Sequence, residues 1–232
     1  MSDAPIPMES SVMVDDPATL PLLACGDIEI LGRMPWSSNG TYLVRVSEGD
    51  EHTQAIYKPE RGERPLWDFP AGLWRREVAT YELGTALGWP VVPPTVIRYD
   101  APLGVGSLQF FVQAHFEEHY FTFHEETRHH QRLRQICLLD LVANNTDRKS
   151  GHVLLGMDGL AWAIDNGLCL HEEFKIRTVI WDFGGEPIDG SLATSIAGLL
   201  DRGLPTIFDD LLDADEREAT LDRARMVLAG AE

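Results

Sequence analysis

The amino-acid sequence predicts an α+β fold built from two parts. Short apolar segments separated by turn-forming residues fill most of the first half, and one long stretch with helical spacing interrupts them. The second half, from about residue 131, has helical spacing along most of its length. We therefore expect a strand-rich part at 19–112 and a more helical part at 113–232. A flexible arm is expected at 1–18, where proline, serine and aspartate occur without periodicity.

The expected strands of the first part are joined by tight turns. Turn-forming residues fill 37–40 and 47–50, between apolar segments of strand length, so these segments are expected to pair in antiparallel fashion. A helix is expected at 73–87, because apolar residues recur there on one face and Gly88 follows as a stop signal. The expected strands cover 28–31, 42–46, 54–57, 91–99 and 107–112.

The second part places polar residues at the ends of apolar elements. An expected helix at 131–143 runs directly into the polar string 144–148. A short apolar hairpin at 153–164 then leads to the polar residues 165–167, and helices are expected from 191 onward. Loops that follow buried elements commonly display functional groups.

Composition and charge exclude several classes of function. The 232 residues include 37 acidic and 19 basic side chains, which gives a formal net charge of -18. Such a surface repels nucleic acid and anionic membranes. The three cysteines lack a CxxC spacing, and no apolar run approaches the ~20 residues that span a bilayer. We expect a cytoplasmic protein with neither a nucleic-acid partner nor stable membrane association.

Four charged residues form a set that suits phosphoryl transfer. Asp147 and Asp165 each follow an apolar element directly, and the hairpin between them is expected to bring them close together. Lys58 ends an expected strand, and Glu77 lies early in the expected helix. Phosphoryl transfer needs a cation on the phosphates, an acid that fixes that cation, a carboxylate that orients the attacking hydroxyl and a carboxylate that binds metal.

Two sequence strings carry a resemblance to a known group. NTDR at 145–148 resembles the catalytic loop, and AIDNGL at 163–168 the metal-binding segment, of the phosphatidylinositol 3-/4-kinase superfamily. The resemblance covers roughly 30–185 and is closest to the type II phosphatidylinositol 4-kinases and related bacterial kinase-like proteins. It implies a two-lobed protein-kinase-like fold that binds ATP. It also implies that Asp147 orients or deprotonates the acceptor hydroxyl and that Arg148 supports the loop.

Weaker pieces imply the nucleotide contacts. WSSNGTY at 36–42 resembles the loop that covers the phosphates, although alone it would be an ordinary hairpin turn. IYKP at 56–59 resembles the segment of the nucleotide lysine, and REVA at 76–79 the helix with its glutamate partner. QFFVQ at 109–113 resembles the segment that links the lobes and binds adenine. The residues implied to bind ATP are Ser37, Ser38, Asn39, Lys58, Glu77, Val112 and Gln113.

One residue departs from the pattern of that superfamily. Where the superfamily has a metal-binding asparagine, five residues after the catalytic aspartate, this sequence has His152. The resemblance implies that Asp165 and His152 hold the divalent cation, Mg²⁺ or Mn²⁺, and imidazole suits manganese better than magnesium. Three possibilities stay open: a shifted metal preference, a direct contact of His152 with phosphate, or impaired metal binding. The last would make the protein a nucleotide-binding pseudokinase.

The expected acceptor is a hydroxyl of a protein or of a soluble small molecule. Between Asp165 and Pro187, Lys175 and Arg177 stand against four acidic residues, so no strong basic patch is available for an inositol phosphate head group. A phosphoinositide-type lipid kinase is therefore a weaker alternative. Nucleotidyl transfer to a protein would use the same residues and differ only in its product.

A different class of function rests on HFEEH at 115–119, which fits the H-x-x-E-H pattern of inverted zinc proteases. That pattern requires both histidines on one helix, whereas this segment follows a strand-like aromatic run. It would also leave Asp147 and Asp165 without a role. We therefore predict an ATP-dependent kinase that transfers the γ-phosphoryl group to a hydroxyl.

Overall fold

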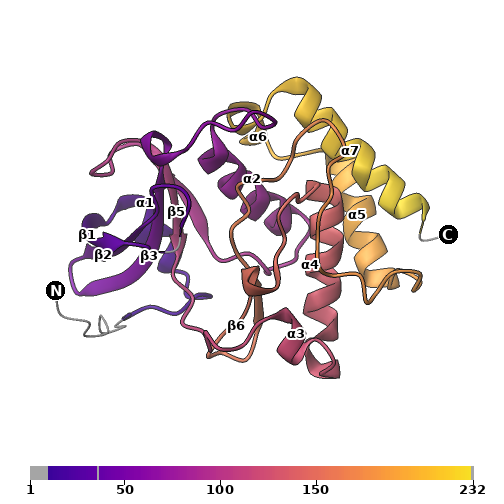
Figure 1. The fold of residues 1–232 in the computed structure, drawn as a ribbon, viewed down its shortest axis with the longest axis horizontal. Coiled ribbons are helices and arrows are strands. Elements are labelled where there is room, and N and C mark those ends of the chain that lie inside the picture. The colour runs from indigo at the N-terminus through magenta and orange to yellow at the C-terminus, as the bar shows by residue number, and fades with distance from the viewer. Residues whose placement is uncertain (1–9, 36, 231–232) are drawn as a thin grey trace. The chain divides into compact units, whose positions relative to one another are not determined.

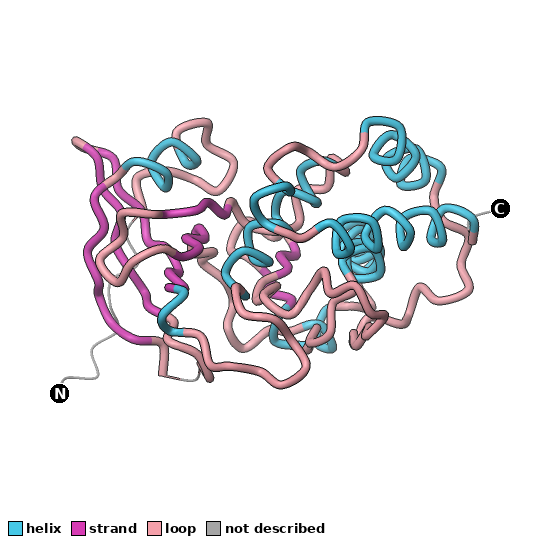
Figure 2. The backbone as a smooth tube through the Cα atoms, turned by 90° about the horizontal axis from the view of Figure 1, so that it is seen from above, coloured by secondary structure: helices cyan, strands magenta, loops and turns pink. Residues whose placement is uncertain are grey.

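The computed structural model describes residues 10–35 and 37–230. Figure 1 labels most of the helices and strands, and Figure 2 colours helices, strands and loops differently. The predicted α+β class is confirmed, with an antiparallel sheet near the N-terminus and mostly helices after it. By their internal contacts, the residues divide into two compact units. The described residues of 1–64 and 94–113 form the first unit, and those of 65–93 and 114–232 form the second.

The first unit is a five-stranded antiparallel sheet with one helix, α1 (Thr19–Cys25). Its strands lie in the order β1-β2-β3-β5-β4 and are drawn in magenta in Figure 2. The first three predicted strands are confirmed. The predicted strand at 91–99 is shorter, because Pro93 and Pro94 have no N–H to donate to a ladder. The unit's strands and short 3-10 helix are β1 (Asp27–Arg33), β2 (Tyr42–Glu48), β3 (Glu51–Pro59), η1 (Glu60–Gly62), β4 (Thr95–Arg98) and β5 (Gly106–Phe110).

Apolar side chains from the sheet and from α1 form the core of this unit. Val44 and Val46, at alternate positions of β2, are fully buried together with Tyr57 of β3. The helix buries Leu22 and Leu23 and packs against β2 and β4. The alternation of buried and more exposed residues along β2 is the pattern of a strand with one face on a core.

Part of the predicted arm makes contacts with this sheet. Residues 1–9 lie outside the described residues. Within 10–18, Ser11 donates a backbone hydrogen bond to the carbonyl of His52 at the start of β3 (2.8 Å), and Val12 is buried. These contacts fix the second half of the segment that the composition assigned to the arm.

The second unit is built around α4 (His130–Ala143), the helix predicted at 131–143. Leu133, Ile136 and Leu139 of α4 are fully buried, and the helix packs against α2 and α7. The predicted hairpin is present as the antiparallel pair of β6 and β7. The remaining elements are α2 (Leu73–Ala86), α3 (Tyr120–Phe123), η2 (Thr127–His129), η3 (Ser150–His152), β6 (Val153–Leu155), β7 (Ala161–Ala163), α5 (Gly190–Arg202), α6 (Phe208–Leu211) and α7 (Ala214–Ala229).

The grouping of α2 with the second unit follows from its contacts with α4 and α6. The assignment of 19–112 and 113–232 as the two lobes of a kinase stays a prediction. No helix in the described part of the chain has both the length and the apolar character of a membrane span.

Candidate functional site

The predicted catalytic loop begins where α4 ends. Asn144 takes the left-handed conformation (φ 52°) after the last residue of α4, which turns the chain out of the helix. Its Nδ2 donates to the carbonyls of His171 (3.1 Å) and Glu173 (2.6 Å), and its Oδ1 accepts from the N–H of Lys175 (2.8 Å). This buried asparagine therefore joins the predicted catalytic loop to the segment that follows Asp165.

A buried ion pair between Arg148 and Asp140 supports this loop. Arg148 donates from Nε and Nη2 to the Asp140 carboxylate over 2.9 to 3.2 Å. It also donates to the carbonyl of Ile164 (2.6 Å) and to Oδ1 of Asn166 (2.6 Å), on either side of Asp165. Burial opposes the charge of Arg148, but Asp140 outweighs this effect and raises the pKa of the guanidinium. The pair thus connects the predicted catalytic loop to the backbone around Asp165.

The Asp140 carboxylate accepts two further hydrogen bonds. Asn145 donates to it from Nδ2 (3.0 Å), and Thr178 donates from Oγ1 (3.1 Å). Asn145 Oδ1 in turn accepts a hydrogen bond from the N–H of Asp147 (2.9 Å). A buried charge is tolerated when its lone pairs are satisfied in this way. The same bonds fix the backbone at Asp147.

Asp147 and Asp165 both lie beside His152. Nδ1 of His152 lies 2.9 Å from the carbonyl oxygen of Asp147, and its Nε2 lies 3.4 Å from Oδ2 of Asp165. Asp165 has a φ of 57°, in the left-handed region that residues other than glycine rarely adopt. Its side chain is 51% exposed, against 26% for Asp147. The hairpin thus brings the two predicted aspartates to the same histidine.

His152 and Asp165 are the two residues of the site that could hold a divalent cation. Because a carbonyl oxygen only accepts, Nδ1 of His152 carries the proton. Burial lowers the pKa of His152 against a smaller opposing effect of Asp165, so at pH 7 the neutral ring presents the lone pair of Nε2 to the carboxylate. Two acceptors that face each other suit a shared cation. Among the residues that the structure describes, no group of three or more histidine, cysteine, aspartate and glutamate side chains is arranged to hold a metal.

Glu77 shapes the turn after Asp165. Its buried carboxylate on α2 accepts a hydrogen bond from the N–H of Asn166 (3.0 Å). A Cβ at Gly167 would come within 3.2 Å of Oε1 of Glu77, so glycine permits the close approach of this turn to the carboxylate. The resemblance implied that Glu77 pairs with Lys58. Lys58 lies on β3 in the first unit, and that pairing stays a prediction.

The other implied nucleotide contacts also lie in the first unit. Oδ1 of Asn39 accepts a hydrogen bond from the N–H of Arg64 (3.0 Å), which ties the turn after β1 to the segment after η1. Trp36 of the same motif lies outside the described residues. Val112 is buried and Gln113 is exposed, just beyond β5. Nucleotide binding by Ser37, Ser38, Asn39, Lys58, Val112 and Gln113 stays a prediction.

The geometry required by the zinc-protease alternative is not formed. Residues 115–119 contain a turn, and α3 begins only at Tyr120. The two histidines of that motif therefore do not lie on successive turns of one helix, and the structure contradicts this interpretation.

Sequence reasoning missed two charged residues of the site. Asp140 is the single acidic residue in the apolar stretch 131–143, and a charge on the buried face of a helix requires a partner, so a signal was present. Nζ of Lys149 lies 2.7 Å from Oδ2 of Asp147. The sequence contained no signal for a role of Lys149, because most lysines are solvated surface charges.

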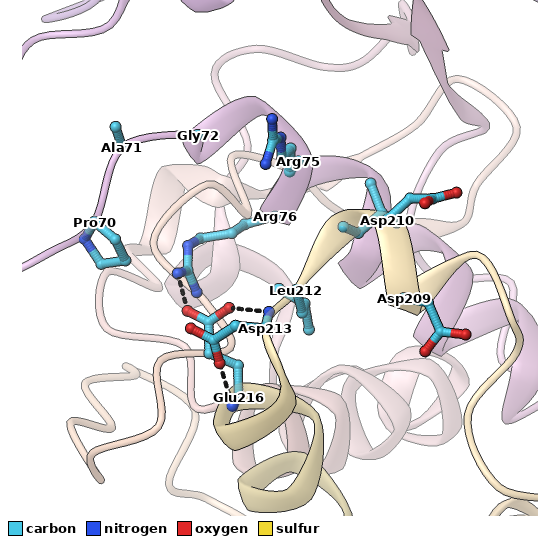
Figure 3. Close-up of a pocket in the computed structure, with 11 residues that line it drawn as sticks. Pro70, Ala71, Gly72, Arg75, Arg76, Asp209, Asp210, Leu212, Asp213 and Glu216 are labelled. Carbon is cyan, nitrogen blue, oxygen red and sulfur yellow. Dashed lines mark hydrogen bonds and ion pairs between the residues drawn. The ribbon is translucent and has the colours of Figure 1, made fainter.

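A pocket of about 320 Å³ lies in the same unit, between the first turn of α2 and the segment 209–216 (Figure 3). Arg76 and Glu216 form a buried ion pair on its wall, and Nη1 of Arg76 also donates to the carbonyl of Cys169 (2.7 Å). Charges of both signs line this pocket, and none of the predicted site residues does.

Solved structures with a similar fold are named as kinases or as Fam20. The match with the structure of the Golgi casein kinase covers 94% of this chain and 74% of that chain, with a TM-score of 0.64 and 15% identity. The Golgi casein kinase with Mn/ADP bound matches with a TM-score of 0.63, 15% identity and coverage of 94% and 75%. The match with the structure of hydra Fam20 with sugar covers 97% of this chain and 91% of that chain, with a TM-score of 0.65 and 12% identity. These likenesses confirm the kinase-like fold.

Comparison of the amino-acid sequence with known proteins shows the family of the chain. No family model matches the sequence. Protein Rv2133c of Mycobacterium tuberculosis (strain ATCC 25618 / H37Rv) is 39% identical over 78% of this chain and 77% of its own length. The chain therefore belongs to the family of protein Rv2133c. Phosphatidylinositol 4-kinase gamma 4 of Oryza sativa subsp. japonica is 28% identical over 70% of this chain, and the match spans 35% of that longer protein.

Proposed function

We propose that this protein is an ATP-dependent kinase that transfers the γ-phosphoryl group to a hydroxyl of a protein or a soluble small molecule. The observation that carries the proposal is the convergence of Asp147 and Asp165 on His152. The likeness of the fold to the Golgi casein kinase supports it. The structure of that kinase with Mn/ADP is a precedent for a divalent cation and an adenine nucleotide on this fold.

Asp147 is suited to orient the acceptor hydroxyl and to take its proton. Its carboxylate is partly exposed, while its backbone is held by Asn145 at the N–H and by His152 at the carbonyl. A general base must be held in place to act on a bound hydroxyl. Lys149, whose ammonium lies beside this carboxylate, is placed to neutralise charge that develops on the transferred phosphoryl oxygens.

Asp165 and His152 are the residues that would hold the divalent cation. When bound with ATP, the cation supplies neutralisation of the charge on the phosphate oxygens. The contribution of the chain is to hold Asp165 in its left-handed conformation: Arg148 binds the carbonyl of Ile164 before it, and Glu77 binds the N–H after it. An imidazole ligand favours manganese over magnesium, because Mg²⁺ prefers oxygen ligands.

The nucleotide contacts and the type of kinase form the finer part of the proposal. We assign ATP binding to Ser37, Ser38, Asn39, Lys58, Val112 and Gln113, with Glu77 fixing the ammonium of Lys58. The strings at 145–148 and 163–168 and the rice relative support a phosphatidylinositol 3-/4-kinase-like type. A lipid acceptor is the weaker alternative, because the net charge of -18 disfavours anionic membranes. The same charge disfavours nucleic acid as a partner, and we place the protein in the cytoplasm.

Turnover of ATP by the purified protein, with Mg²⁺ or Mn²⁺, tests this proposal. We expect turnover to be lost in Asp147→Ala and in Asp165→Asn. Asp222→Asn, which changes an exposed carboxylate on α7, is the matched control and should leave turnover unchanged. Intact-mass analysis separates a phosphate adduct of about 80 Da from an AMP adduct of about 329 Da, which would indicate nucleotidyl transfer. Binding of ATP without turnover with either metal would favour the pseudokinase, and no binding would contradict a nucleotide-dependent function.

The metal preference can be tested separately from turnover. We expect His152→Ala to weaken Mn²⁺ binding in the presence of a non-hydrolysable ATP analogue, as measured by electron paramagnetic resonance. His152→Asn, which introduces the asparagine of the resembled superfamily, should keep metal binding and narrow the preference for Mn²⁺ over Mg²⁺. His115→Ala, at a partly exposed histidine outside the site, is the control. Unchanged Mn²⁺ binding in His152→Ala would remove His152 from the metal site.

A further inference from the structure

We propose that two joined loops of the second unit, 66–69 and 171–175, bind the positively charged segment of a protein acceptor. This inference rests on the proposed kinase function and adds the class of acceptor. We name the exposed part of these loops the acidic-aromatic surface. Its members are Leu66, Trp67, Asp68, Glu172, Glu173 and Phe174.

The two loops are held together by specific contacts. Nζ of Lys175 donates to the carbonyl of Asp68 (2.8 Å). Phe69 is buried, and its ring lies 5.1 Å from that of His171 in an edge-on arrangement. Arg76 of α2 places its guanidinium 4.9 Å from the centre of the same phenylalanine ring. The loops therefore form one fixed surface.

Large apolar side chains extend from this surface into solvent. Trp67 is 96% exposed, the highest value among the large apolar side chains of the described residues, and Phe174 is 69% exposed. Trp67 directly precedes Asp68 and Phe174 directly precedes Lys175, the two residues whose hydrogen bond joins the loops. Exposed aromatic residues gathered at one place mark interaction sites, and tryptophan is the residue most enriched where binding energy concentrates.

The charges of the surface determine the kind of partner. Asp68, Glu172 and Glu173 are exposed carboxylates. The cation among them, Lys175, already lies within 3.3 Å of Nε2 of His171 and of Oε2 of Glu173, besides its bond to the Asp68 carbonyl. The face of an indole attracts cations, and neighbouring carboxylates strengthen that attraction. A lysine- or arginine-rich segment complements such a surface, whereas an anionic membrane does not.

The same surface is connected to the proposed catalytic loop. Asn144 binds the backbone of 171–175 at three points and is separated from Asp147 by only two residues. A basic segment bound to the acidic-aromatic surface would therefore be held by loops whose positions are fixed relative to Asp147. The proposal therefore expects the acceptor's serine, threonine or tyrosine to lie in the same chain as this basic segment, within reach of Asp147.

The test compares two synthetic peptides that differ only in charge. Each contains one serine, flanked by arginine and lysine in one peptide and by glutamate in the other. Fluorescence anisotropy measures their dissociation constants with the intact protein, so that the result does not depend on turnover. We expect the basic peptide to bind at least about tenfold more tightly and to lose affinity as NaCl rises from about 0.05 M to about 0.5 M.

Substitutions locate the binding to this surface. Trp67→Ala should weaken the basic peptide about tenfold and Trp67→Phe less, because the smaller ring keeps part of the cation–π attraction. Met226→Ala, at an exposed apolar residue of α7, should have no effect. Equal affinity for both peptides, or indifference to Trp67→Ala, would overturn the inference. Binding to vesicles of anionic lipid in place of the basic peptide would overturn it in favour of a membrane.

A thermal-shift measurement with ATP and Mn²⁺ on the same preparations separates this inference from the proposed function. Stabilisation by the nucleotide without discrimination between the peptides would refute the acidic-aromatic surface alone. Absence of nucleotide binding would refute the kinase proposal and, with it, the role of this surface in binding an acceptor.

Discussion

Two buried arginine–carboxylate pairs of the second unit differ in what they hold. Arg148 and Asp140 are 0% and 1% exposed in their side chains, and hydrogen bonds link this pair to five other residues of the candidate site. Arg76 and Glu216 are 4% and 8% exposed and lie on the wall of the pocket in Figure 3. The second pair joins α2 to α7 and reaches the backbone at Cys169.

The comparison shows that a buried ion pair matters chiefly through the backbone that it fixes. An ion pair in the interior can be close to neutral for stability, but removal of one partner leaves a charge without compensation. Both pairs should therefore matter for stability. Of the two pairs, only that of Arg148 and Asp140 connects the segments that carry Asp147 and Asp165, so only this pair should also control the positions of these two aspartates.

The largest effect is expected from Asp140→Ala. The substitution leaves the guanidinium of Arg148 buried without its carboxylate and frees Asn145 and Thr178, so we expect a loss of about 3–5 kcal/mol in the free energy of unfolding. Urea denaturation at constant pH measures it. Asp140→Asn keeps the shape of the side chain and should lose less stability while still lowering ATP turnover. A stable Asp140→Ala protein with unchanged turnover would contradict the positioning role of this pair.

A smaller effect is expected from Glu216→Ala. Arg76 keeps its bond to the Cys169 carbonyl and borders the pocket, where water can approach, so we expect a loss of about 1–3 kcal/mol in urea denaturation. Part of this loss comes from the start of α7, where Glu216 and Asp213 form a capping box. Turnover per folded molecule should stay unchanged. A selective loss of turnover at full stability would remove the distinction between the two pairs.

Periodicity and turn residues were sufficient to predict most of the fold. The helix at 131–143 and the hairpin that follows it are short-range features, and the sequence contains their signals locally. The strand expected at 91–99 covers only Thr95–Arg98. The prediction gave more weight to the apolar residues of this segment than to Pro93 and Pro94. The grouping of α2 with α4 depends on contacts between distant segments, which no local pattern specifies.

The candidate site was predictable only in part. The segments around Asp147 and Asp165 can be recognised in the sequence because polar residues directly follow apolar elements there. The bond from Glu77 to the turn after Asp165 spans 89 positions, and the pair of Arg148 and Asp140 depends on which face of α4 is buried. Such contacts follow from packing, so a sequence can show that a buried charge needs a partner without showing which partner it has.

A still smaller change of stability, with a clear effect on function, is expected from Gly167→Ala. The added Cβ would lie 3.2 Å from Oε1 of Glu77, so the turn after Asp165 must shift by a few tenths of an ångström. The free energy of unfolding should stay within about 1 kcal/mol, because alanine also restricts the unfolded chain. We expect turnover to fall about tenfold, since small displacements at a reacting centre are costly. Gly190→Ala, where the added Cβ meets nothing within 4 Å, is the control, and equal turnover in both variants would argue against tight positioning by Glu77.

The smallest effect is expected at His129, a buried group that differs from both arginines in its partners. The residue is 3% exposed, and among the described residues its Nε2 has no hydrogen-bond partner, although Oε2 of Glu126 lies 3.8 Å away. Burial lowers its pKa, with a further contribution from Arg128 against the opposing effect of Glu126. The unfolded chain therefore takes up this proton first as the pH falls.

The free energy of unfolding should consequently decrease as the pH drops from about 6.5 toward the lower pKa of the folded state. His129→Gln removes the titrating group, so its unfolding free energy should fall less over the same interval. The lowered pKa values of His152 and His171 contribute equally to both proteins and cancel in the comparison. Urea denaturation of the two proteins at about pH 7 and about pH 5 measures how much the free energy of unfolding of each changes with pH. The loss of packing in the variant is the same at both pH values, so it does not affect this change. Identical slopes would mean that His129 titrates alike in the folded and unfolded states, and its burial would then have no electrostatic cost of the kind that the two arginine pairs compensate.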